Sequence, residues 1–403
     1  MEAGEDRLRS GFVAILGRPN VGKSTLLNAL TGEKVAIVTA KPQTTRNRIA
    51  GVVEVAARKG KRQDSRPAAQ IVFVDTPGVH KPGSQLDRRM LQEVHEALET
   101  RDVVLVLVDA TRRVGLGPTE MDDRTSRNAG PSTTVASATS AQDDNLVNQS
   151  QVSKSRLGAP SSPSSEQKAV RGGPRSGAPN WASEDEFLFG LVRKLDCPVF
   201  LVLTKIDLVA KDQLLPLIDS LIKQYSFAEV IPVSARKRDG LDVLLGKIVA
   251  ALPAGERYFP KDQYTDQPQR FMVAELIRER ILVETGEEVP YASAVVIEQF
   301  EEPEPTTQKK GTPQRPPLTR ISAAIYCERD GQKAILIGKR GAKLKEIGTG
   351  ARKQIESLLG TRVYLELRVI VEPGWRESRS FIDSLDWRHQ LERLAEKQDQ
   401  DEG

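Results

Sequence analysis

The sequence predicts two consecutive domains, an α/β domain with a mostly parallel sheet followed by a smaller α+β domain. Up to residue 252, short β-branched runs alternate with helical stretches, the pattern of a parallel sheet covered by helices on both faces. After Pro253 the order changes to helix, two strands, helix and strand. A chain of 403 residues is long enough for two or three domains of about 150 residues each.

The expected strands and helices of the first domain alternate except at one point. The second and third strands follow each other across a polar tip at residues 58–69 and should pair antiparallel. The expected strands cover residues 12–16, 52–56, 71–75, 103–109, 199–203 and 230–233, and the expected helices cover residues 23–30, 86–98, 184–195, 213–220 and 241–250.

Polar segments interrupt both domains. Residues 112–180 contain no aromatic residue and show no apolar period, so they cannot bury enough surface to offset the entropy of ordering them. We expect a disordered insertion there, and a polar loop at 301–317, where charge and repeated Pro exclude a helix or a central strand. The expected organisation is an N-terminal tail at 1–10, a domain at 11–252, a linker at 253–269, a domain at 270–376 and a charged tail at 377–403.

Composition excludes several classes of protein. The net charge of +4 is too small to indicate nucleic-acid binding unless the positive charge is concentrated in one place. Cys197 and Cys327 match no metal-ligand spacing, which argues against a zinc site and a disulfide framework and favours a reducing compartment. No apolar run approaches the roughly 20 residues of a membrane span, and residues 1–10 lack a signal-peptide core. We expect a soluble, cytoplasmic protein.

A phosphate-binding loop is indicated by the match of residues 17–24 to GxxxxGK[ST]. The match lies between an expected strand and an expected helix, the context that this pattern requires. The backbone N–H groups can wrap phosphates, Lys23 can reach the terminal phosphates, and the Ser24 hydroxyl can ligate Mg²⁺. The alternative, a glycine-rich turn with an incidental lysine, does not account for this context. The candidate residues are Gly17, Arg18, Pro19, Asn20, Val21, Gly22, Lys23, Ser24 and Thr25.

A second motif, DTPG, follows the third expected strand. A carboxylate at the carboxyl end of a strand beside a phosphate loop can bind Mg²⁺, directly or through water, and the Gly78 N–H can contact a γ-phosphate. By itself this tetrapeptide is an ordinary turn, but its position downstream of the phosphate loop favours the functional interpretation. The candidate residues are Asp75, Thr76, Pro77 and Gly78.

Two further motifs select the base. Asp207 follows the fifth strand, where its carboxylate can accept two hydrogen bonds from the N1 and N2 edge of guanine, which adenine does not offer. A backbone N–H after the next strand could reach guanine O6. The order of these motifs favours GTP over ATP. The candidate residues are Thr204, Lys205, Asp207, Ser234, Ala235 and Arg236.

With these motifs, residues 11–252 resemble the G domain of a translation-factor-class small GTPase. The stretch KPQTTRNR at 41–48 resembles the first switch of the Era family of ribosome-assembly GTPases. This resemblance implies GTP or GDP as the nucleotide, and Mg²⁺ held by Ser24, Asp75 and a switch threonine. Whether Thr44 or Thr45 ligates the metal stays open. The implied catalytic residues are Asn20, Lys23, Thr44, Thr45 and Gly78.

Two positions depart from common GTPase patterns. Thr204 stands where the guanine motif normally begins with Asn, which could lower nucleotide affinity, and Val79 stands where many GTPases carry a water-orienting Gln. Because valine cannot orient water, we expect slow intrinsic turnover. Relatives with an Asn at the position of Asn20 recruit K⁺. Potassium activation is therefore a hypothesis here, and a loop-bracing hydrogen bond from Asn20 is the alternative.

The second domain contains a basic GxxG loop at 338–341. Two glycines flanking two cations let the backbone approach nucleic-acid phosphates, as in KH domains. Residues 333–353 contain seven Lys or Arg and one acid, which gives this stretch a charge of +6. A solvated helix face is the alternative, but the element order matches a type II KH domain. The candidate RNA-binding residues are Gly338, Lys339, Arg340, Gly341, Lys343, Lys345, Arg352 and Lys353.

The Era resemblance continues through this domain, on segments such as EVPY at 288–291 and Gly374-Trp375. It implies binding to the 3′ region of 16S ribosomal RNA, assistance in maturing the small ribosomal subunit, and in some members peripheral contact with the cytoplasmic membrane. We expect a monomer. The insertion at 112–180 has no counterpart in that family. Two alternatives remain: a tandem-domain ribosome GTPase such as Der, disfavoured by the single GxxxxGKS, and a KH protein whose nucleotide domain is a relic.

Overall fold

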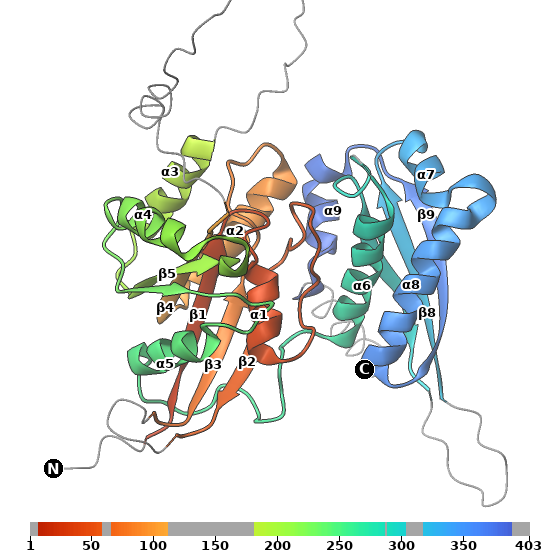
Figure 1. Ribbon diagram of the computed structural model, residues 1–403. Helices are drawn as coiled ribbons and strands as arrows, with labels where there is room; N and C mark the ends of the chain where they lie inside the picture. Colours follow the sequence, from red (N-terminus) through yellow and green to blue (C-terminus); the bar gives the residue numbers. More distant parts are fainter. Residues whose placement is uncertain (1–6, 59–65, 112–180, 287, 304–316, 389–403) are drawn as a thin grey trace, which may run out of the picture. The chain divides into compact units, whose positions relative to one another are not determined.

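The computed structural model describes residues 7–58, 66–111, 181–286, 288–303 and 317–388. Within these residues the chain forms one six-stranded and one three-stranded sheet, each with its own helices (Figure 1). The expected disorder of residues 112–180 lies outside the described residues, as does most of the polar loop 301–317.

The first sheet has the strand order β2-β3-β1-β4-β5-β6. The β2–β3 pair is antiparallel and all other pairs are parallel, which confirms the expected topology. β1 begins inside the expected tail 1–10, because Arg9 already pairs with Ala69. The strands are β1 (Arg9–Gly17), β2 (Ile49–Val55), β3 (Ala69–Asp75), β4 (Val103–Asp109), β5 (Val199–Thr204) and β6 (Glu229–Pro232).

Helices cover both faces of this sheet because successive strand residues point to opposite sides. Val13 and Ile15 pack with α1 (Lys23–Thr31) and α5 (Leu241–Ala251). Ala14 and Leu16 face α2 (Gln85–Glu99) and α3 (Trp181–Val192). The η1 turn (Ile206–Leu208) and α4 (Lys211–Ile222) follow β5. The alternation within β1 therefore fixes both layers of the core.

The second domain has a three-stranded sheet in the order β7-β8-β9. β7 and β8 are antiparallel and β8 and β9 are parallel, and one apolar cluster joins the sheet to its helices through residues such as Ile277, Ile325 and Ile355. A helix, α7, directly precedes the GxxG loop. The elements are α6 (Gln269–Glu284), β7 (Ala294–Glu301), β8 (Leu318–Cys327), α7 (Asp330–Ile337), η2 (Lys339–Gly341), α8 (Ala342–Leu359) and β9 (Arg362–Val371).

The expected C-terminal tail is partly a folded element. The turn η3 (Trp375–Glu377) and the helix α9 (Arg379–Ser384) follow β9. The Trp375 side chain is fully buried and its Nε1 donates to the Ala292 carbonyl at 2.9 Å, and Ile382 is buried beside it. The prediction that a tail begins at residue 377 is therefore wrong for residues 377–388, because α9 covers this tryptophan.

The segment 253–269, expected to be a linker, packs along the first domain. The Val52 N–H donates to the Tyr264 carbonyl at 2.9 Å, and the Thr265 hydroxyl donates to the Ala50 carbonyl at 2.7 Å. These bonds satisfy backbone groups of β2, which lies at the edge of the sheet. Among the helices that the structure describes, none is long and apolar enough to cross a membrane.

Candidate nucleotide site and RNA interface

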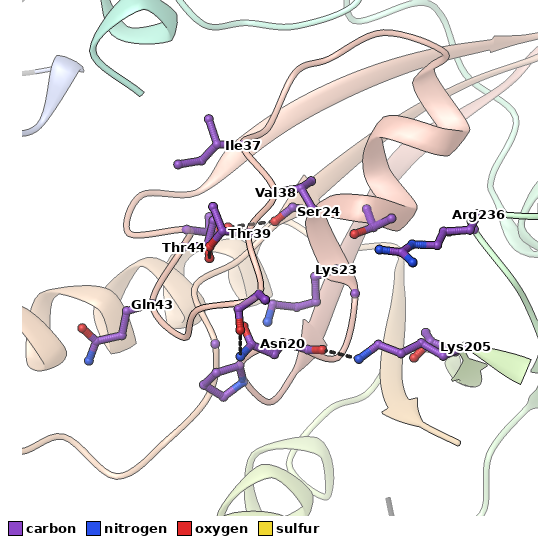
Figure 2. A pocket seen from close by; sticks show the side chains of 18 of the residues that line it. Asn20, Lys23, Ser24, Ile37, Val38, Thr39, Gln43, Thr44, Lys205 and Arg236 are labelled. Carbon is purple, nitrogen blue, oxygen red and sulfur yellow. Dashed lines mark hydrogen bonds between the residues drawn. The ribbon is translucent and has the colours of Figure 1, made fainter. Parts of the chain in front are cut away.

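A cavity of about 460 Å³ opens among the loops that follow β1, β3, β5 and β6, beside the segment between α1 and β2 (Figure 2). Most of the predicted nucleotide residues line it: Pro19, Asn20, Gly22, Lys23, Ser24, Thr25, Thr44, Thr45, Gly78, Thr204, Lys205, Asp207, Ala235 and Arg236. The remaining predicted residues are not in this lining: Gly17, Arg18, Val21, Asp75, Thr76, Pro77 and Ser234.

Sequence reasoning missed part of the wall. The missed residues are Ile37, Val38, Thr39, Ala40, Gln43 and Leu208. Most of them precede the switch threonines in a stretch with no helical or strand period, so their only signal was proximity to Thr44 and Thr45. Gln43 has a φ of 57°, a conformation that costs energy in a non-glycine residue. Its side-chain amide donates to Asp87 at 3.2 Å.

Lys23 is the cation of the phosphate loop. It is 6% exposed and its ammonium donates to the Gly17 and Arg18 carbonyl oxygens at 3.1 and 3.0 Å. Gly22, with a φ of 99°, begins α1 in a conformation that other residues rarely adopt. Burial lowers the pKa of Lys23 to about 8, against the opposing attraction of Asp75. A bound phosphate would supply the negative charge that this buried ammonium lacks.

Three oxygen-bearing side chains converge beside Lys23. The Ser24 hydroxyl donates to Asp75 Oδ2 at 2.6 Å, and Thr45 Oγ1 lies 3.3 Å from the same oxygen and 2.9 Å from Ser24 Oγ. Asp75 is fully buried, its other oxygen has no hydrogen-bond partner, and burial raises its pKa. This donor set fits Mg²⁺, which binds one or two carboxylates together with substrate phosphates and waters. The described residues contain no cluster of three or more His, Cys, Asp or Glu side chains.

The two switch threonines lie in different surroundings. Thr45 belongs to the Ser24–Asp75 cluster, whereas Thr44 donates to the Lys41 carbonyl at 2.7 Å and lies 2.9 Å from the Thr39 hydroxyl. The geometry therefore favours Thr45 over Thr44 as the metal ligand, a choice that the sequence left open.

The base motifs meet at the other end of the cavity. The Asp207 carboxylate is exposed and accepts a hydrogen bond from the Ser234 hydroxyl at 2.6 Å, which orients it. The Thr204 hydroxyl donates to the Val21 carbonyl of the phosphate loop at 2.6 Å. Thr204 thus joins the base motif to the phosphate loop although it lacks an amide.

Two other predicted residues have side-chain partners of their own. Arg18 forms an ion pair with Asp185 of α3 at 2.7 Å, so its side chain serves the packing of α3 while its carbonyl receives Lys23. The Asn20 amide donates to the Ala40 carbonyl at 2.8 Å, as expected for a loop brace (Figure 2).

Val79 is 1% exposed within the core beneath α2 and α3, so it cannot orient a water molecule.

The GxxG loop has the backbone geometry that its glycines require. Gly338 has φ 69° and ψ 177°, a region essentially restricted to glycine, and an added Cβ would meet the Cβ of Lys343 at 2.6 Å. Arg340 and Gly341 also have positive φ. The loop therefore turns tightly between α7 and α8 and presents its two cations outward.

The candidate RNA-binding side chains lie on this loop and on α8. Lys339, Arg340, Lys345, Arg352 and Lys353 are exposed, as phosphate contacts require. Lys343 pairs with Glu346 at 2.7 Å, and Arg352 lies 4.0 Å from Glu356. These two cations are therefore partly neutralised, and the loop and the other α8 cations carry most of the free positive charge.

Comparison with known proteins identifies both domains. The family model described as a 50S ribosome-binding GTPase matches residues 12–138, and a KH domain model matches residues 288–376. A GTPase Era of Geobacter metallireducens is 38% identical over 381 residues, covering 94% of this chain and 98% of that relative. The chain belongs to the Era GTPase family.

Other Era proteins are also similar over nearly the whole chain. A GTPase Era of Ruminiclostridium cellulolyticum is 35% identical over 380 residues, covering 94% of this chain and 98% of the relative. An Era variant of Aquifex aeolicus bound to GDP and AlF4⁻ is similar with a TM-score of 0.69 and 32% identity, covering 94% of this chain and 99% of that one. An Era complex with MgGDPNP and nucleotides 1506–1542 of 16S ribosomal RNA matches with the same TM-score, identity and coverage. This Era-family chain is a GTPase with a P-loop domain and a C-terminal KH domain.

Proposed function

We propose that this Era-family GTPase is a switch that binds the 3′ region of 16S ribosomal RNA through its KH domain and assists assembly of the small ribosomal subunit. Mg²⁺ and GTP would occupy the 460 Å³ cavity, with Ser24 and Thr45 of its lining at the metal and the buried Asp75 carboxylate, which both side chains contact, behind them. The observation that carries the switch is that the KH domain, through α6 and the stretch before β7, holds the segment before β2 on both sides of Thr44.

Two side chains of α6 contact this switch segment. Arg278 is 3% exposed and donates to the Thr44 carbonyl, and its other nitrogen lies 3.5 Å from the Gln43 carbonyl. Glu279 accepts from the Val38 N–H at 3.1 Å and from the Lys34 ammonium at 2.5 Å. These contacts bracket Thr39 and Ala40, which line the cavity.

Two cations of the switch segment reach back to the KH domain. Lys41 donates to the Leu282 and Thr285 carbonyls at the carboxyl end of α6, where the helix dipole favours a cation. Arg46 is 8% exposed and donates to the Ser293 and Tyr291 carbonyls before β7. Binding of Mg²⁺ and γ-phosphate at Thr45 would pull on the same short segment that these contacts hold. The nucleotide site and the KH domain therefore both act on the switch segment. Coupling between two sites requires such a shared element.

RNA binding rests on the GxxG loop and on the relative crystallised with 16S ribosomal RNA. Crosslinking in cells followed by sequencing of the bound RNA tests it. Enrichment of the 3′ region of 16S ribosomal RNA is expected for the wild-type protein and not for a Gly338→Ala variant. Equal recovery of that region with both proteins would contradict the role of the loop.

Slow hydrolysis and potassium activation are further parts of the proposal. Val79 cannot orient water, and Asn20 lies in the cavity wall beside the switch segment. A potassium ion held by the Asn20 side chain would add a fixed positive charge near the γ-phosphate. Equal GTP turnover in sodium and potassium buffers would remove this hypothesis and leave Asn20 as the loop brace.

The remaining parts of the proposal concern location. We place the protein in the cytoplasm as a monomer, with peripheral contact to an anionic membrane through the cationic surface of η2 and α8. Vesicle sedimentation with phosphatidylglycerol and with phosphatidylcholine tests the contact. Equal binding to both, or binding to neither, would contradict it.

A further inference from the structure

Asp109, at the end of β4, is a buried acid whose role the proposed site does not yet include. It is 3% exposed, it does not line the cavity, and no motif singled it out. Its Oδ2 accepts a hydrogen bond from the Lys205 ammonium at 2.6 Å. The same ammonium donates to the Asn20 carbonyl at 2.8 Å (Figure 2). One lysine thus connects β4, the base motif and the phosphate loop.

The register of the sheet places these groups together. Asp109 pairs with Thr204 across the parallel β4–β5 ladder, one residue before Lys205, and the Ala110 N–H donates to the Thr204 carbonyl at 3.0 Å. Asp109 Oδ1 is held separately, by the Thr111 N–H at 3.0 Å and the Thr111 hydroxyl at 2.7 Å. The carboxylate is therefore fixed before any nucleotide arrives.

The electrostatics agree with a preformed ion pair. Burial would raise the pKa of Asp109, but the hydrogen bonds from Lys205 and Thr111 outweigh it and lower the pKa, so the carboxylate is ionised at neutral pH. Lys205 has a φ of 58° and a side chain that is 34% exposed. A flexible lysine stem in that setting would lose much rotamer freedom on binding a ligand unless its ammonium were already anchored.

We propose that Asp109 is a positioning residue that anchors the Lys205 ammonium against the Asn20 carbonyl, and so holds the base-binding wall and the phosphate loop in their nucleotide-binding geometry. The inference rests on the proposed nucleotide site. It predicts that loss of the carboxylate speeds release of GDP and GTP through Lys205. The alternative role, in which Asp109 only secures the turn at Thr111, would act without Lys205.

A double-mutant cycle on GDP release separates the two roles. Release of fluorescent GDP from the full chain is followed after excess GTP is added. Asp109→Asn should speed release about tenfold in the wild-type background and less than twofold in a Lys205→Met background, because the charge-assisted bond is already absent there. The same acceleration in both backgrounds, or none in either, would overturn the inference. If Lys205→Met itself leaves GDP release unchanged, the base-site assignment fails instead.

Control variants guard against a general loss of stability. Asp102→Asn removes an acid at the opposite end of β4, where it accepts from the Phe12 N–H at 2.8 Å, and should leave GDP release unchanged. Thr111→Val removes the hydroxyl contact and keeps the carboxylate, so release should change less than twofold. If Asp109→Asn does not fold, Asp109→Ser, which removes the charge but keeps an acceptor for Thr111, is measured in the same cycle with the same outcomes.

Discussion

The burial of Lys23 predicts that the phosphate loop destabilises the nucleotide-free protein and that alkaline pH relieves this cost. The folded protein holds the pKa of Lys23 at about 8, against an ordinary value of 10.5. Between these two values the unfolded chain binds more protons than the folded chain, so the free energy of unfolding rises with pH. From pH 7 to 9.5 the lysine contributes a gain of about 2 kcal/mol.

Nucleotide affinity should change in the opposite direction. A phosphate needs the ammonium form of Lys23, and above pH 8 the free protein has lost this proton, so binding must take it up again. The dissociation constant of GDP should therefore rise by up to about tenfold per pH unit above pH 8. Opposite signs for stability and for affinity distinguish this lysine from a general effect of pH.

The assay compares urea unfolding of nucleotide-free wild-type protein and a Lys23→Met variant at pH 7 and 9.5. Other titrating groups contribute equally to both proteins, so the change in their difference isolates Lys23. The wild type should gain about 2 kcal/mol relative to the variant at pH 9.5. A difference that stays constant with pH would refute the argument that burial controls this side chain.

Three further predictions concern single contacts of the two sites. Thr45→Ala should raise the Mg²⁺ concentration needed to bind a GTP analogue about tenfold, whereas Thr44→Ala should raise it less, and the reverse order in a Mg²⁺ titration would contradict the geometry. Thr204→Val removes the hydrogen bond to Val21 and should weaken GDP binding by about 1 kcal/mol in calorimetry, with unchanged affinity as the contrary result. Gly338→Ala forces a strained loop and should weaken binding of 16S 3′-end RNA by about 1–3 kcal/mol in fluorescence anisotropy. The matched control is Gly331→Ala, where an added Cβ would meet no neighbouring group within 4 Å, and it should leave RNA binding unchanged. Equal losses of RNA affinity in both variants would contradict the role of the GxxG loop.

Features that depend on residues close in sequence could be predicted. The alternation of strands and helices predicted the direction of pairing in the first sheet, and the phosphate loop, DTPG and the base motifs reached one cavity because parallel strands end at one edge. The ion pairs of Arg18 and Asp109 could not be predicted, because Asp185 and Asp109 belong to no motif and lie far along the chain from the residues with which they pair.

Long-range packing explains the remaining differences. α9 is a short helix that is secured by burial against Trp375, and its own sequence reads as a charged segment. The switch residues 37–43 have no period of their own and owe their positions to Arg278 and Glu279, more than 230 residues away in the chain. Contacts between segments so far apart in the chain could not be predicted from local sequence patterns.

The central claim is that the nucleotide state is communicated to the RNA-binding domain through α6. Its most direct test is the affinity for 16S 3′-end RNA with a GTP analogue and with GDP, for the wild type and for Arg278→Met. The wild-type affinities should differ by at least fivefold between the two nucleotides, and the variant should lose most of that difference while it still binds RNA and nucleotide. Equal wild-type affinities in the two states, or a full difference in the variant, would contradict the account.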